Sequence, residues 1–245
     1  MSEDLAYGID IGGSGMKSAV VDLDSGELVT DRYRIDTPQP ATPEAMAEVV
    51  VELVEHHGWT GSVGCAFPAV VKAGIVRSAA NIDRSWLDVD ADGVFTEALG
   101  AEVHMINDAD AAGLAEVRYG AARGRTGVVM MLTFGTGIGS GLFVDGVLVP
   151  NTELGHLELD GFDAEKRAAA SIRKPDGLTW SEWGERVDRY LEHVEDLFSP
   201  DLFVIGGGAS KKAAKWLDDV SIDTEIVVAA KHNDAGIVGA ALVAP

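Results

Sequence analysis

The chain has 245 residues, and its 40 Asp and Glu against 19 Lys and Arg give a formal net charge of −21 at pH 7. Hydrophobic residues make up 47% of the chain and charged residues 24%, which is typical of a folded globular protein and argues against disorder. The acidic balance disfavours general binding to nucleic acid or to anionic membranes, although backbone amides and local cations can still hold a phosphate.

The first half of the chain is predicted to combine strands with one clear helix. That helix begins at Pro43 with Thr42 as its N-cap and runs to at least Val54, because apolar residues recur on one face. Strands are predicted over residues 6–11, 17–23, 28–35, 62–67 and 103–106. This order of elements indicates an α/β lobe.

The second half contains the longest helical pattern and a possible repeat of the first half. Helices are predicted over residues 108–117, 180–197, 211–217 and 234–243, and strands over 128–133, 140–144, 202–205 and 226–229. The plan of strand, glycine loop, strand, acidic turn and strand occurs at residues 7–29 and again at 131–149. Two interpretations are open: one copy in each lobe of a pseudo-symmetric molecule, or two unrelated glycine hairpins.

Glycine is the unusual part of the composition, with 29 residues, or about 12% of the chain against an average near 7%. The glycines cluster at residues 12–15, 135–141 and 206–208 and lack the low-complexity context of a flexible linker. Because glycine has no Cβ, successive amide N–H groups can point at one anion. The clusters therefore indicate three phosphate cradles, with ordinary tight turns as the alternative.

The first glycine loop follows a predicted strand and has a positive and a negative side chain beside it, Lys17 and Asp10. The Gly12 and Gly13 amides and the Ser14 hydroxyl can donate to a phosphate. Lys17 adds a positive charge, and Asp10 can hold, usually through water, the Mg²⁺ that accompanies a phosphate. A P-loop is excluded because no Gly-Lys-Ser/Thr opens a helix here, and a dinucleotide fingerprint is excluded because a strand follows.

The second glycine loop has the same character. Thr133 and Thr136 supply hydroxyls beside Gly135 and Gly137, so the two loops together suggest one polyanion held from two sides. The third run, which includes Gly207, follows a strand and precedes a predicted helix, whose N-terminus would add a partial positive charge.

Two polar pairs are candidates for chemistry. Asn107 and Asp108 lie at a predicted strand-to-helix junction, as either an N-cap or a general base with the residue that orients its substrate. Glu153 and His156 suit two vicinal hydroxyls of a sugar, with a metal site or a surface pair as alternatives. Zinc is disfavoured there because no Cys or second His lies nearby.

Cysteine usage and the chain's apolar segments predict the compartment. Cys65 is the single cysteine, which excludes an intramolecular disulfide, and its small apolar neighbours favour a core position. The N-terminus is acidic, unlike the start of a signal peptide, and no uncharged apolar stretch reaches the roughly 18 residues of a membrane span. We therefore expect a cytoplasmic protein with no membrane partner and no nucleic-acid partner.

In this order the motifs resemble those of sugar kinases with the actin/hexokinase/heat-shock ATPase fold, and their spelling is similar to that of the ROK (repressor, open reading frame, kinase) group. The resemblance covers nearly the whole chain and lies in residues 10–17, 107–110, 133–141, 153–161, 198–201 and 205–208. Within the group it is strongest to the branch that uses inorganic polyphosphate. It implies an α/β, two-lobed actin-like ATPase (ribonuclease H-like) fold with a glycine-rich β-hairpin phosphate loop in each lobe.

The resemblance also implies the domain organisation and the reaction. A small α/β lobe would span residues 1–107 and a large one 108–232, with a terminal helix at 233–245 packing back on the first and the active site in the cleft between them. A phosphoryl group would pass from inorganic polyphosphate to the 6-hydroxyl of glucose with Mg²⁺ on the donor. ATP as a further donor stays open, and a homodimer is expected.

By the same resemblance, Asp108 is the general base that takes the proton from the sugar hydroxyl. The sugar-holding positions are Asn81, Asn107, Asp108, Glu153 and His156, with Glu158 as a further candidate. The positions that hold the phosphoryl donor are Gly12, Gly13, Ser14, Lys17, Thr133, Gly135, Thr136, Gly137 and Gly207, with Asp10 holding Mg²⁺ through water.

Departures from the family pattern refine these expectations. Residues 157–170 contain no Cys, so the structural zinc of most members is expected to be absent, and the early first strand disfavours a repressor with a DNA-binding domain. A polyphosphate chain needs a cationic path, and the candidates are Lys17, Arg118, Arg123, Arg125, Lys211, Lys212 and Lys215. The alternatives are an ATP-dependent hexose kinase, a non-catalytic sugar sensor and an actin-like assembly protein.

Overall fold

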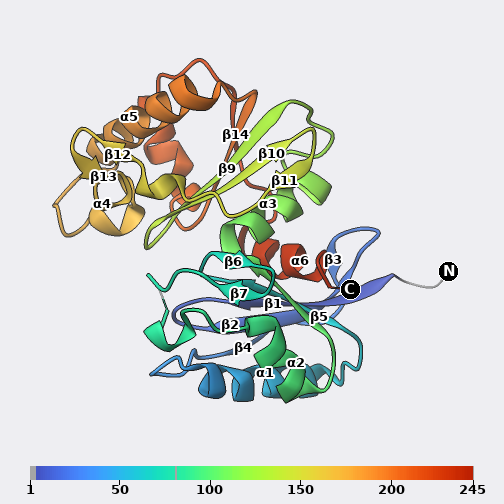
Figure 1. Cartoon of the computed structure of the whole chain (residues 1–245). Coiled ribbons are helices and arrows are strands. Elements are labelled where there is room, and N and C mark those ends of the chain that lie inside the picture. The colour runs from blue at the N-terminus through green and yellow to red at the C-terminus, as the bar shows by residue number, and fades with distance from the viewer. Residues whose placement is uncertain (1–3, 81, 245) are drawn as a thin grey trace. The chain divides into compact units, whose positions relative to one another are not determined.

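The computed structural model describes residues 4–80 and 82–244. Contacts within the chain divide it into a first unit, Met1–Ala115 with Asn233–Pro245, and a second unit, Glu116–His232 (Figure 1). The boundary between these two units falls inside helix α3 (Asp108–Tyr119). The first turns of α3 belong to the first unit because they pack on the C-terminal segment: a Cβ placed on Gly239 would lie only 1.7 Å from the Ala111 carbonyl oxygen.

A mixed sheet forms the centre of the first unit. Its strands are β1 (Leu5–Ile11), β2 (Met16–Asp22), β3 (Glu27–Leu28), β4 (Tyr33–Ile35), β5 (Val63–Phe67) and β8 (Val103–Asn107). The order is β3-β2-β1-β5-β8, with β4 also paired to β2; β1 and β2 are antiparallel, and β1, β5 and β8 are parallel. The single strand expected over 28–35 is wrong, because β3 and β4 pair with different parts of β2.

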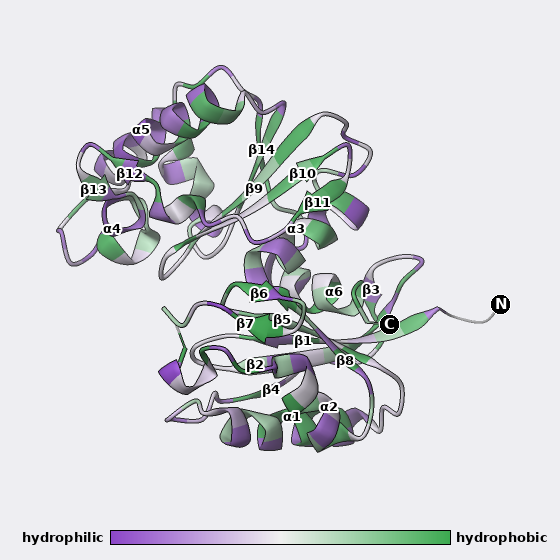
Figure 2. Cartoon of the chain, in the orientation of Figure 1, coloured by the Kyte–Doolittle hydropathy of each residue, from purple (hydrophilic) through white to green (hydrophobic). Residues whose placement is uncertain are grey.

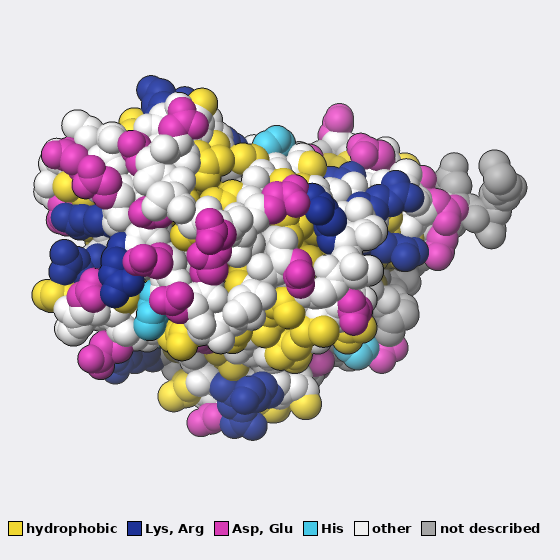
Figure 3. Space-filling model, turned by 90° about the horizontal axis from the view of Figure 1, so that it is seen from above, with side chains coloured by type: hydrophobic (Ala, Val, Ile, Leu, Met, Phe, Trp, Pro, Cys, Tyr) yellow, Lys and Arg dark blue, Asp and Glu magenta, His cyan; other side chains and the backbone are white. Residues whose placement is uncertain are grey.

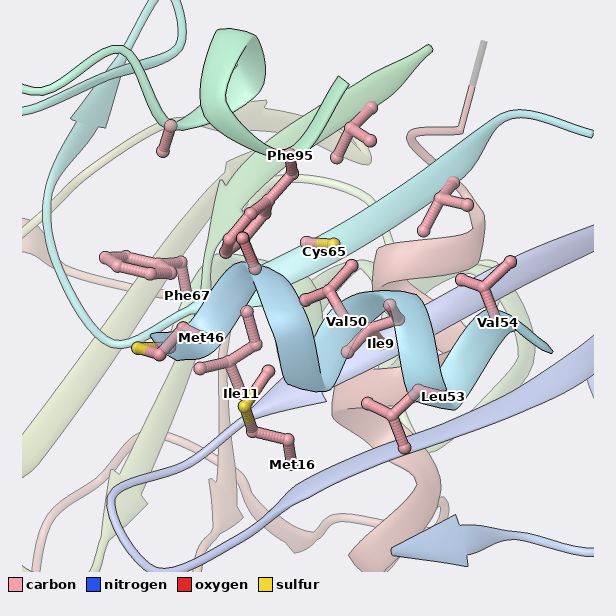
Figure 4. Packing of buried hydrophobic residues seen from close by; sticks show 14 of the residues in the cluster. Ile9, Ile11, Met16, Met46, Val50, Leu53, Val54, Cys65, Phe67 and Phe95 are labelled. Carbon is pink, nitrogen blue, oxygen red and sulfur yellow. The ribbon is translucent and has the colours of Figure 1, made fainter. Parts of the chain in front are cut away.

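One face of this sheet is covered by two helices, α1 (Pro43–His57) and α2 (Ala91–Leu99). The predicted start of α1 is confirmed: the Thr42 hydroxyl accepts a hydrogen bond from the Ala45 amide at 3.3 Å, with Pro43 in the first turn. Met46, Val50, Leu53 and Val54 line its buried face and pack over β1, as Figure 4 shows. Cys65 is buried in the same cluster, as expected.

The opposite face of the sheet is covered by the C-terminal helix α6 (Ala235–Ala241). Gly8 on β1 and Gly64 on β5 are paired in register and point at this helix. A Cβ on Gly8 would lie 2.0 Å from the Ile237 carbonyl oxygen, and one on Gly64 would lie 1.8 Å from that of Ala240. The α6 backbone therefore rests directly on the sheet, at a distance that only glycine permits.

The second unit repeats the strand order of the first. Its sheet contains β9 (Val128–Phe134), β10 (Ile138–Val144), β11 (Val147–Val149), β14 (Leu202–Gly206) and β15 (Ile226–Val228). The order is β11-β10-β9-β14-β15, in which β9 and β10 form an antiparallel hairpin and β9, β14 and β15 are parallel. In both units a glycine hairpin is thus followed by two parallel strands on one side. The shared topology supports the interpretation of the internal similarity as a structural repeat.

Helix α5 (Trp180–Phe198) packs on this second sheet. It starts with a capping box, in which the Thr179 hydroxyl accepts from the Glu182 amide and the Glu182 carboxylate accepts from the Thr179 amide. Its buried residues include Trp183, Val187 and Tyr190, whereas its outer face is hydrophilic (Figure 2). The long amphipathic pattern was therefore a reliable sign of a helix.

The remaining elements are short. In the first unit they are β6 (Val71–Lys72), β7 (Ile75–Val76) and the 3₁₀ turns at Arg84–Trp86 and, in part, at His232–Asp234. In the second unit they are the hairpin of β12 (Glu158–Leu159) and β13 (Phe162–Asp163), α4 (Glu165–Ala168), and 3₁₀ turns at Leu154–His156, Ala170–Ile172, Ser210–Lys215 and Leu217–Asp219. Among the described residues, no helix combines the length and the apolar character that crossing a bilayer requires.

Candidate active site

The first glycine loop closes the β1–β2 hairpin. The Gly12 amide donates to the Gly15 carbonyl at 3.1 Å, and the Gly13 and Ser14 side of the turn is exposed. Asp10 and Lys17 are paired across the two strands, and the Lys17 ammonium lies 3.1 Å from an Asp10 carboxylate oxygen. The structure thus brings all five predicted donor-side residues of this unit to one end of the sheet.

Arg34 lies across the same loop, and the sequence did not reveal it. It is paired in register with Lys17 on the neighbouring strand, and its guanidinium donates to the Ser14 carbonyl at 2.7 Å. A Cβ on Gly15 would lie 2.4 Å from the Arg34 Nε, so the glycine is what lets the arginine approach. The guanidinium also pairs with the Asp36 carboxylate at 2.6 Å. A second cation therefore stands beside the loop.

A cavity of about 440 Å³ opens beside this loop within the first unit. Its lining includes Gly12, Gly13, Thr37, Ala80 and Ile82. Predicted sugar-holding residue Asn81 lies outside the described residues, but both of its sequence neighbours line the cavity. The cavity has room for a small polar molecule next to a predicted phosphate loop.

The structure shows which of Asn107 and Asp108 caps helix α3. The Asn107 side-chain oxygen accepts from the amides of Ala109 at 2.9 Å and Asp110 at 3.1 Å, which makes Asn107 the cap of α3. Its amide nitrogen donates to the Ala69 carbonyl at 3.1 Å, and the residue is 7% exposed. Asp108 is the exposed first residue of the helix, and one of its oxygens accepts from the Ala109 amide at 2.8 Å. Because its neighbour caps the helix, Asp108 can present its carboxylate to solvent.

The second glycine loop closes the β9–β10 hairpin in the second unit. The Gly135 amide donates to the Gly137 carbonyl at 3.0 Å, and Thr136 is exposed at the tip. Ser171 holds the loop from outside, since its amide donates to the Gly135 carbonyl at 3.0 Å and its hydroxyl to the Thr136 carbonyl at 2.7 Å. Thr133 lies at the end of β9, opposite Gly139.

The third glycine run packs against this loop. Gly207 has φ +75°, and a Cβ there would lie 2.6 Å from the Phe134 carbonyl oxygen. The Ala209 amide donates to that same oxygen at 3.2 Å. The helix expected over 211–217 is wrong: Ser210–Lys215 is a 3₁₀ turn interrupted at Lys212, so no α-helix N-terminus adds charge here.

The Glu153 to His156 turn is fixed to the same hairpin. The Leu154 amide donates to the Ser140 hydroxyl at 3.0 Å, and Gly155 packs on β10 so closely that a Cβ would lie 2.2 Å from the Ile138 carbonyl oxygen. Glu153 and His156 are both exposed residues, with the Glu153 Oε2 and His156 Nε2 4.0 Å apart. The Glu153 side chain is only 42% exposed, and this partial desolvation raises the pKa of its carboxyl; the hydrogen bond to Asp163 raises the pKa of His156.

Asp163 and Glu165 are further residues that the sequence interpretation missed. Their carboxylates and the His156 ring place one atom each within 4.8 Å of one another. Those atoms are joined by hydrogen bonds within the protein: His156 Nδ1 to Asp163 Oδ2 at 3.0 Å, and the Ile138 amide to Glu165 Oε2 at 3.3 Å. The cluster is therefore a hydrogen-bond network around His156, the histidine predicted to hold the sugar. An acidic pair within ten residues of a Glu-x-Gly-His segment was the available signal.

Two of the cations predicted to line a polyphosphate path have partners within the protein. Arg125 is paired with Glu225, and Arg118 and Lys231 both contact the Tyr119 ring, so these cations have partners on the protein surface. On the face drawn in Figure 3, acidic side chains are scattered among Lys and Arg and do not form one patch. Glu158 is exposed on the first strand of the short hairpin.

The chain is similar to known proteins over most of its length. The model of the ROK family matches residues 6–177. The polyphosphate glucokinase of Mycobacterium tuberculosis (strain ATCC 25618 / H37Rv) is 51% identical over 237 residues, which cover 96% of this chain and 89% of that protein. The polyphosphate glucokinase of Mycobacterium leprae (strain TN) is 49% identical, over 96% of this chain and 73% of that protein.

Solved structures agree with these sequence matches. The inorganic polyphosphate/ATP-glucomannokinase from Arthrobacter sp. strain KM has a TM-score of 0.93 and 53% identity, over 97% of both chains. A ROK family glucokinase from Streptomyces griseus, solved with glucose and AMPPNP, has a TM-score of 0.84 at 24% identity, over 98% of this chain and 99% of that chain. The expected α/β, actin-like kinase fold is thereby confirmed. By its family match and by its structure, the chain belongs to the ROK family.

Proposed function

We propose that this protein is a sugar kinase that transfers a phosphoryl group from inorganic polyphosphate to the 6-hydroxyl of glucose. The observation that carries the proposal lies at the start of α3, where the Asn107 side chain caps the helix and Asp108 is an exposed residue. The polyphosphate glucokinases and the glucomannokinase described above, at about half identity over nearly the whole chain, support the donor and the acceptor.

The acceptor side of the reaction needs a base and groups that orient the sugar. Asp108 would take the proton from the attacking hydroxyl, the usual role of a carboxylate in phosphoryl transfer. Asn107 is held rigidly by its cap bonds, and its amide nitrogen has a second hydrogen for a sugar hydroxyl. Glu153 and His156 would bind vicinal hydroxyls, and Asn81 would complete the set.

The donor side would be held by the two glycine hairpins. The residues assigned to it are Gly12, Gly13, Ser14, Lys17, Thr133, Gly135, Thr136, Gly137 and Gly207. Among the described residues, Asp10 belongs to no cluster of three or more metal-ligating side chains, so it fits a Mg²⁺ that keeps most of its water. When bound, Mg²⁺ neutralises charge on the phosphate oxygens. Both hairpins would act on the same donor, with each unit supplying one.

The finer expectations belong to the same proposal. The Arthrobacter protein is a polyphosphate/ATP-glucomannokinase, which supports ATP as a second donor here. A cytoplasmic location and a homodimer stay predictions, as do the domain limits 1–107 and 108–232 and an active site in the cleft between the lobes. The absence of structural zinc is also a prediction, based on the stretch from 157 to 170 that has no cysteine.

The direct test is purified protein with glucose and Mg²⁺, offered polyphosphate and ATP in separate reactions. Glucose 6-phosphate is expected with polyphosphate. Formation from ATP but never from polyphosphate would favour the ATP-dependent hexose kinase. No product from either donor, together with measurable glucose binding, would favour a sugar sensor.

Arg34→Gln is expected to raise the KM for polyphosphate about tenfold, because a charge-assisted hydrogen bond contributes about 1.5–3 kcal/mol. The KM for glucose should not change, since Arg34 contacts the first glycine loop, which the proposal assigns to the phosphoryl donor. Arg77→Gln is the matched control: Arg77 is 48% exposed and paired with Asp88, much as Arg34 is 46% exposed and paired with Asp36. Equal KM values for polyphosphate in the two variants would show that Arg34 does not help to bind the phosphoryl donor.

A further inference from the structure

A short hairpin returns the chain to the sugar-holding histidine. Strands β12 and β13 are joined by Asp160 and Gly161, both in the left-handed region with φ of 53° and 80°. This reversal places Asp163 seven residues after His156 in sequence but 3.0 Å from it in space, measured from Oδ2 to the ring Nδ1. The contact therefore depends on the hairpin and not on helical or strand periodicity.

Both oxygens of the Asp163 carboxylate have donors. Oδ2 accepts from the His156 ring, and Oδ1 accepts from the Glu165 amide at 3.2 Å, at the first residue of α4. The Asp163 side chain is 29% exposed, against 45% for His156. A carboxylate bonded on both oxygens has little freedom to rotate, so it can fix the plane of the ring to which it bonds.

The orientation of the His156 ring determines which of its two nitrogens faces the sugar. Because Asp163 is an acceptor, the His156 nitrogen that faces it must carry a hydrogen, and that nitrogen is Nδ1. Nε2 is then the nitrogen that points away from Asp163, and it lies 4.0 Å from Glu153 Oε2. A sugar hydroxyl between Nε2 and Glu153 could bond to both groups. The charged groups around the ring are Asp163, Glu165 and Glu153.

The same segment also touches the second glycine loop. Glu165 Oε2 accepts from the Ile138 amide at 3.3 Å, and it packs so closely on Gly137 that a Cβ there would overlap it, at 2.3 Å. Asp163 is bonded to the Glu165 backbone. A continuous chain of contacts therefore connects the His156 ring with the loop assigned to the phosphoryl donor.

We propose that Asp163 is a positioning residue, which holds the His156 ring so that Nε2 faces the sugar and ties this histidine, through Glu165, to the second glycine loop. The proposal rests on the function proposed above, in which His156 binds the sugar. It assigns no chemical step to Asp163 itself. Asp163 orients the His156 ring. Loss of that orientation should therefore raise the KM for glucose more than it lowers kcat.

The kinetic test is Asp163→Asn, which keeps the size of the side chain and removes its charge. The KM for glucose is expected to rise about tenfold while kcat changes less than about threefold, because one hydrogen bond to a charged group is weakened. Asp160→Asn is the control, since Asp160 lies in the same hairpin and pairs with the exposed Arg189. A fall in kcat with an unchanged glucose KM would overturn the proposal.

A double-mutant cycle separates positioning from general damage. In a His156→Gln background, Asp163→Asn should add less than about twofold to the glucose KM, because residues that act through one another are not additive. Full additivity of the two effects would show that Asp163 does not act through His156, and the proposal would fall.

A nuclear magnetic resonance measurement tests the inference without any activity. The ¹⁵N spectrum of the histidine rings, with His156 assigned by its loss in His156→Gln, is expected to show a hydrogen on Nδ1 in the wild type and a changed pattern in Asp163→Asn. An Nδ1 without hydrogen in the wild type would refute the inference even if glucose phosphorylation is confirmed. Conversely, the expected spectrum with no phosphorylation would refute the proposed reaction and leave the ring geometry standing.

Discussion

Asp108→Asn is expected to lower kcat about 10³-fold while the affinity for glucose stays within about threefold, because a positioned general base contributes roughly 10² to 10⁴ in rate. The amide keeps the shape of the side chain but cannot take the proton of the attacking hydroxyl. The cap of α3 should survive, since the Asn107 side chain accepts the amides of both Ala109 and Asp110. Steady-state kinetics and glucose titration calorimetry measure the two quantities.

The control for this variant is Asp90→Asn. Asp90 is also an acidic residue at a helix start, where it accepts from the Gly93 amide at 3.0 Å, and Asn is an equally good cap. Its kcat should match that of the wild type. If Asp108→Asn kept more than a tenth of the wild-type kcat, the general base would have to be another residue.

Gly64→Ala is expected to destabilise the first unit by about 3 kcal/mol, the upper part of the range for overpacked cores. The added methyl would lie 1.8 Å from the Ala240 carbonyl oxygen, so either α6 or β5 must move. Both are backbone, which cannot swing away as a long side chain can. Urea titration, followed by hydrogen exchange of the β5 amides, measures the loss.

Gly208→Ala serves as the control for this substitution. A Cβ on Gly208 meets nothing within 4 Å, and its backbone does not lie in the left-handed region. Its free energy of unfolding should stay within about 0.5 kcal/mol of the wild type, as for an ordinary surface change. Equal free energies of unfolding for the Gly64→Ala and Gly208→Ala variants would contradict the direct packing of α6 on the sheet.

Local chemistry in the sequence predicted much of the fold. The Thr42–Pro43 pair marks a helix start by its own side chains, and apolar residues spaced along 180–197 define α5. Helix α2 was missed because its nine residues include a glycine and show only a short apolar pattern. The stretch 211–217 looked helical from its lysines and alanines, yet tertiary packing around Trp216 makes it a series of 3₁₀ turns.

The candidate site could be predicted where its residues are close in sequence. The glycine hairpins and the Glu153 to His156 segment are local motifs, so they could be named without coordinates. Arg34 and Asp163 could not, because strand register and the reversal of a hairpin bring them to their partners. At Asn107 and Asp108 either residue type can cap a helix, and only the backbone geometry selects one.

Helix α6, which packs directly on Gly8 and Gly64, is translated long after the strands that it covers. Strand β5 emerges from the ribosome before α6 by roughly 8 to 34 s at about 5–20 residues per second, and β1 emerges earlier still. Until then the glycine face of their sheet has no cover, whereas the second unit is continuous in sequence and already has all of its residues. The first unit, whose strands are translated first, can therefore complete its packing only after α6 has been synthesised.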